Sequence, residues 1–62
     1  MGTVLEYAKT VLMNVSFDVS LFQKELHKVV TLMVPDEVNS LINWIQQEFS
    51  GQETLLNVIS NL

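Results

Sequence analysis

The sequence predicts an all-α protein, a small three-helix bundle with a C-terminal segment. Apolar residues recur three and four positions apart, the spacing of one helix face, in three parts of the chain. Residues typical of turns separate these parts. The expected helices span about residues 3–15, 18–33 and 36–50. A chain of 62 residues is short for more than one domain, so we expect residues 1–62 to form a single helical domain.

The first helix is predicted from a capping box and an apolar stripe. Thr3 is the expected cap, and Glu6, three residues later, has the spacing needed to bind the Thr3 amide. The stripe consists of Val4, Ala8, Val11 and Val15. Valine is a mediocre helix former, so we expect packing against other helices to hold this one.

The second helix is expected to begin at a cap formed by Asp18 or Ser16. Its stripe consists of Phe22, Leu26, Val29 and Met33. The helix is expected to end before Pro35, because the proline ring disfavours helical geometry at Val34.

The third helix is predicted to begin at the turn formed by Pro35 and the residues after it, because the fixed φ of proline suits a first helical turn. Asp36 and Glu37 follow at the positive end of the helix dipole. The stripe consists of Val38, Ile42, Ile45 and Phe49. Gly51 is expected to close the helix in the left-handed conformation.

The C-terminal segment, residues 52–62, has apolar residues at helical spacing at positions 55, 59 and 62. We expect a short fourth helix. An extended strand is the alternative, and it would have no other strand to pair with. So short a helix is unstable alone, so we expect it to dock on the bundle or on a second subunit.

The expected core combines the stripes with adjacent apolar residues. It consists of Val4, Ala8, Val11, Leu12, Val15, Phe22, Leu26, Val29, Val30, Met33, Val38, Leu41, Ile42, Ile45 and Phe49.

Apolar residues make up 48% of the chain, more than we expect one small chain to cover. Folding at this length buries only about 60% of the unfolded surface. Domains of this size usually need disulfides, a metal or self-association. The absence of Cys excludes disulfides, and one His without a thiol cannot make the tetrahedral N/S shell of a structural zinc site. Self-association is the remaining way to stabilise so small a domain.

Apolar residues outside the main stripes are the candidates for a subunit interface. Tyr and Trp are favoured in such contacts. The candidates are Tyr7, Met13, Leu21, Leu32, Trp44, Leu55, Leu56, Ile59 and Leu62. The alternative is that the C-terminal segment covers Trp44 within one chain.

We expect no catalytic, cofactor-binding or metal-binding residues. His27 lies between Lys24 and Lys28 on a polar helix face, as a surface histidine would. The acids lack the spacing of a calcium loop. The sequence has no glycine-rich phosphate loop, no nucleophile motif and no motif specific to a protein family.

The charge and hydropathy patterns exclude other classes of partner. Three lysines, no arginine and a net charge of -4 cannot supply a surface for nucleic acid. No apolar run is long enough to span a membrane. The first residues lack the basic and apolar regions of a secretory signal, so we expect a cytoplasmic protein.

We therefore expect a non-catalytic protein that self-associates, most simply as a homodimer, and acts through protein–protein contacts. The alternative is a monomeric binding module whose apolar groove takes an amphipathic helix of a partner protein. A peripheral membrane helix ranks last, because such helices carry Lys and Arg on the polar face.

Overall fold

The computed structural model describes residues 3–61, which form four helices and no strand. In chain order these are α1 (Val4–Asn14), α2 (Val19–Val30), α3 (Pro35–Glu48) and α4 (Glu53–Ile59). The prediction of an all-α bundle is confirmed. The C-terminal segment is the short fourth helix and not a strand.

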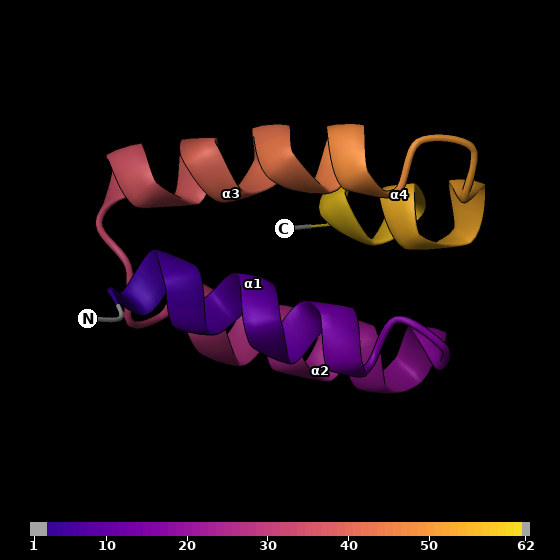
Figure 1. Cartoon of the computed structure of the whole chain (residues 1–62), viewed down its shortest axis with the longest axis horizontal. Coiled ribbons are helices and arrows are strands. Elements are labelled where there is room, and N and C mark those ends of the chain that lie inside the picture. Colours follow the sequence, from indigo (N-terminus) through magenta and orange to yellow (C-terminus); the bar gives the residue numbers. More distant parts are fainter. Residues whose placement is uncertain (1–2, 62) are drawn as a thin grey trace.

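The helices pack as two layers (Figure 1). α1 and α2 lie side by side in one layer, and α3 and α4 form the other. α1 also packs on α3, and α2 on α4, so the main contacts follow a ring in the order α1, α2, α4, α3. α4 therefore docks on its own chain.

The overall dimensions match those expected for a compact folded chain of this length. The radius of gyration is 10.5 Å, against about 10.6 Å expected for this length. The accessible surface is 4087 Å², against about 4,100 Å² expected for this mass. The total accessible area is therefore no larger than a chain of this mass normally exposes.

All four helices contribute to one core. Its buried residues are Ala8, Leu12, Phe22, Leu26, Val29, Leu41, Ile45, Phe49, Leu55 and Val58. Leu55 and Val58 belong to α4 and were not in the predicted core. Some predicted core residues are instead only half-buried: Val4, Val11, Val15, Val30, Met33, Val38 and Ile42. In so small a bundle, neighbouring helices cover only a narrow strip of each helix. Apolar residues at the edges of a wider stripe therefore stay partly exposed.

α2 ends at Val30, earlier than the predicted position 33. The amide of Leu32 bonds to the Val29 carbonyl at 3.0 Å, and that of Met33 to the Val30 carbonyl at 3.2 Å. These bonds span three residues and form a tighter turn than an α-helix. The turn leads into the extended backbone of Val34 (φ -80°, ψ 160°), which the following proline favours.

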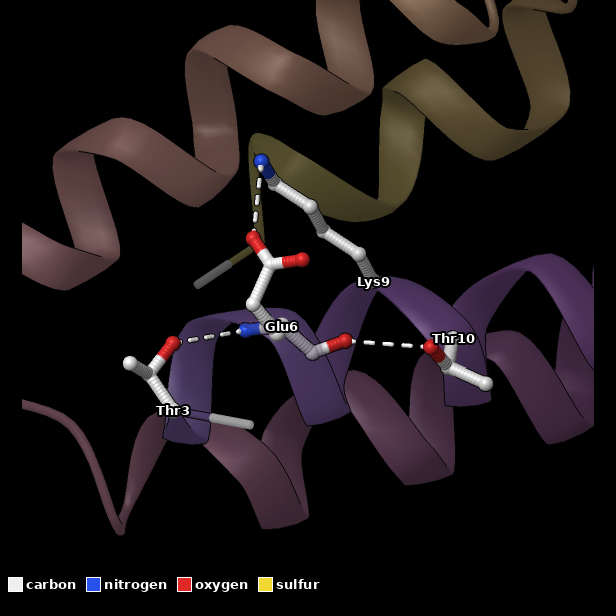
Figure 2. Close-up of polar contacts among 4 residues, drawn as sticks. All are labelled: Thr3, Glu6, Lys9 and Thr10. Carbon is white, nitrogen blue, oxygen red and sulfur yellow. Dashed lines mark hydrogen bonds and ion pairs between the residues drawn. The ribbon is translucent and has the colours of Figure 1, made fainter. Parts of the chain in front are cut away.

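Half of the predicted capping box forms at the start of α1 (Figure 2). The Glu6 amide donates to Thr3 Oγ1 at 3.1 Å, as expected for the cap. The Glu6 carboxylate, however, lies 3.8 Å from Lys9 Nζ, one turn further along the helix. The Thr10 hydroxyl donates to the Glu6 carbonyl at 3.1 Å.

The next two helices begin as local signals predict. Of the two predicted caps of α2, Asp18 is the one used: its Oδ1 accepts from the Leu21 amide at 3.2 Å. α3 begins at Pro35, and the Val34 amide donates to Glu37 Oε1 at 3.1 Å. That bond satisfies a donor that the helix start would otherwise leave unpaired.

Gly51 has the predicted left-handed conformation, with a φ of 89°. It does not end α3, because that helix ends at Glu48 with Phe49 as its C-cap, two residues before the predicted position 50, so Gly51 lies in the turn that leads to α4. We expect Gly51→Ala to lower the free energy of unfolding by about 1 kcal/mol, because side chains with a Cβ disfavour this backbone region. No heavy atom lies within 4 Å of the added Cβ, so a clash would not contribute. Urea unfolding measures the effect, with Ser50→Ala as the neighbouring control. Equal stability of the two variants would contradict the left-handed turn.

Candidate interaction surface

Trp44 belongs to an aromatic cluster beside the core. The rings of Phe22 and Phe49 meet edge to face with centroids 5.5 Å apart, and those of Trp44 and Phe49 do so at 5.6 Å. Lys9 of α1 lies over the Trp44 ring, with Nζ 5.9 Å from the centroid. Trp44 is therefore half-buried, and α1 supplies part of its cover.

The interface candidates in the C-terminal segment pack largely in or against the core of their own chain. Leu55 is only 1% exposed, so it is a core residue and offers no surface to a second subunit. Leu56 and Ile59 are partly buried against the core. Leu62 lies outside the described residues.

The other candidates are exposed. They are Tyr7 (58%), Met13 (48%), Leu21 (39%) and Leu32 (65%). The exposed large apolar residues that sequence reasoning missed are Phe17 (80%), Val19 and Val34. Within the described part of the chain, all of these residues belong to α1, α2 or the turns that follow them, and none belongs to α3 or α4.

Phe17 and Val34 were missed because they lie in turns. Helical periodicity predicts which way a side chain points only inside a helix. The available signal was position, because connecting segments almost always run over the surface. An apolar residue between two predicted helices is therefore a candidate for exposure even when it fits no stripe.

Charge divides between the two layers as sharply as exposed apolar area does. In α1, α2 and the turn between them, Lys9, Lys24 and Lys28 balance Glu6, Asp18 and Glu25. The acids of the other layer are Asp36, Glu37, Glu48 and Glu53, and residues 35–61 include no lysine or arginine. The formal net charge of -4 therefore belongs to the α3–α4 layer, and the apolar layer is neutral.

The described residues offer little for binding a small ligand. Residues 3–61 enclose no detected pocket, and they contain no group of three His, Asp or Glu side chains placed to hold a metal ion. His27 is exposed on α2. Among α1 to α4, no helix has both the length and the apolar character needed to cross a bilayer.

Comparison of the chain with protein-family models, with curated proteins and with solved structures gave no match. The surface of the described residues is neutral with exposed apolar side chains on the α1–α2 layer, and it is acidic on the α3–α4 layer.

Proposed function

We propose that this chain is a small non-catalytic helical protein that associates with a second copy of itself, most simply as a homodimer, and acts through protein–protein contacts. The observation that supports the proposal is that, among the described residues, the exposed large apolar side chains all belong to α1, α2 and the turns that follow them. Covering such a surface is favourable, and large apolar patches commonly mark contact sites. The twofold dimer is the commonest closed assembly.

The mass in solution tests this proposal. Sedimentation or light scattering over a concentration series should show a species of twice the 7.1 kDa chain mass, and its population should rise with concentration. A monomer at every concentration up to about 1 mM would contradict self-association, because even an interface worth about 4 kcal/mol is half-populated near that value.

A monomeric binding module remains the second candidate, with less support from the surface. The exposed residues line no detected pocket within residues 3–61, and the predicted anchor Trp44 is partly covered by Lys9. These observations favour a shallow surface over a groove. Monomeric mass together with tight binding of an amphipathic helical peptide would favour this candidate over the homodimer.

A further inference from the structure

A second stripe runs along α2 beside its buried stripe. Leu21, Glu25 and Lys28 each directly precede a buried residue, so they lie about 100° round the helix from the core. Leu32 continues the stripe in the turn that follows α2. The spacings are four, three and four residues, which is the pattern of a seam between two packed helices.

The middle of this stripe is an ion pair with an apolar residue at each end. Glu25 Oε2 lies 3.5 Å from Lys28 Nζ. The Glu25 side chain is 23% exposed and that of Lys28 is 68% exposed, so the lysine can bind further acceptors. Leu21 and Leu32 at the two ends are both exposed.

We infer that two copies of the chain associate through this stripe, with the two α2 helices antiparallel about a twofold axis between positions 26 and 27. This inference rests on the proposed self-association and assigns its surface and orientation. In an antiparallel pair of α2 helices, position 25 of one copy faces position 28 of the other. Position 21 then faces position 32 of the other copy, because the two pairs of positions share one midpoint. Leu21 then meets the partner's Leu32, and Glu25 meets the partner's Lys28.

The charges select this orientation. A parallel pair would place Glu25 against the partner's Glu25 and Lys28 against the partner's Lys28, and like charges at close range oppose association. The antiparallel pair brings two carboxylates and two ammonium groups together in alternation. Such a network holds its side chains more favourably than an isolated surface ion pair does.

The charge of the whole molecule favours a second copy as the occupant of this surface. The two acidic α3–α4 layers would lie on the far sides of the dimer, about 30 Å apart at roughly 10 Å per helix layer. Their repulsion is then screened, because the Debye length is about 8 Å at physiological ionic strength. An anionic membrane would instead meet a neutral layer, which offers it no electrostatic attraction.

The area available is near the lower limit for a specific dimer. The chain measures 29 × 19 × 18 Å between Cα atoms, so the α1–α2 face covers about 29 by 18 Å. Covering the full face on both copies would bury roughly 1,000 Å² in total, where specific interfaces begin, and the α2 stripe alone covers less. We therefore expect a reversible dimer whose orientation depends on the central charges.

Charge reversal tests the inference. In Glu25→Lys both central charges are positive, and in Lys28→Glu both are negative, so each variant alone sets like charges against each other. We expect the Kd for self-association to weaken at least about tenfold in each variant. An equimolar mixture should recover the wild-type Kd within about threefold as a one-to-one complex, because opposite charges then meet. Both variants lack the ion pair within one chain, so recovery on mixing reports contacts between chains.

Glu6→Lys is the matched control, because it removes the equivalent ion pair with Lys9 on α1. It should leave the Kd within about twofold of wild type. Sedimentation of each variant and of the mixture gives the Kd, and circular dichroism shows that each variant is folded. If wild type associates but mixing gives no recovery, or if Glu6→Lys weakens the Kd equally, this inference is wrong and self-association stands. A wild-type chain that stays monomeric overturns both.

Discussion

Replacing Leu26 with aspartate is expected to unfold the chain. Leu26 is 0% exposed at the middle of α2, and residues 3–61 include no buried polar or charged residue that could pair with a carboxylate. Burying an unpaired polar or charged group costs several kcal/mol. A domain of this size is stabilised by only about 3–5 kcal/mol, so little folded protein should remain. Far-UV circular dichroism should show the loss of helix.

Gln23→Asp is the control for that result. Gln23 lies one turn before Leu26 on the same helix, and it is exposed. The Gln23→Asp substitution introduces the same charge at an exposed position, so it should change the free energy of unfolding by about 0.5 kcal/mol or less. Retention of the helical signal in Leu26→Asp would contradict the placement of Leu26 in the core.

Leu55→Ala is expected to remove most of the stability, because α4 completes the core of its own chain. Leu55 is 1% exposed, and α4 packs against α2 and α3. Truncating a buried leucine to alanine costs about 2–5 kcal/mol, through lost apolar burial and the cavity that remains. Urea unfolding, followed by circular dichroism, measures the change in free energy.

The matched control is Thr54→Ala, which changes the preceding and exposed residue of α4. Its effect should be within about 0.5 kcal/mol of zero. Equal unfolding free energies for the two variants would mean that α4 does not dock as described, and that Leu55 returns to the candidates for an interface between subunits.

The candidate surface was predictable where a residue lies inside a helix and away from its stripe. Leu21 and Met13 meet that condition and are exposed. Trp44 also lies off its stripe, yet Lys9 and Phe49 pack against its ring. These neighbours come from a different helix and from the end of α3, so the spacing around Trp44 gave no sign of them.

By itself, the sequence determined the helices and the starts of α1, α2 and α3. The Thr3 and Asp18 caps, Pro35 and Gly51 each act through bonds or dihedral limits within a few residues, so their effects are readable locally. Only the tertiary structure decided the ring order of the helices and the docking of α4 on its own chain. These features depend on which apolar faces meet across long stretches of sequence, and the stripes of different helices are too alike to specify that choice.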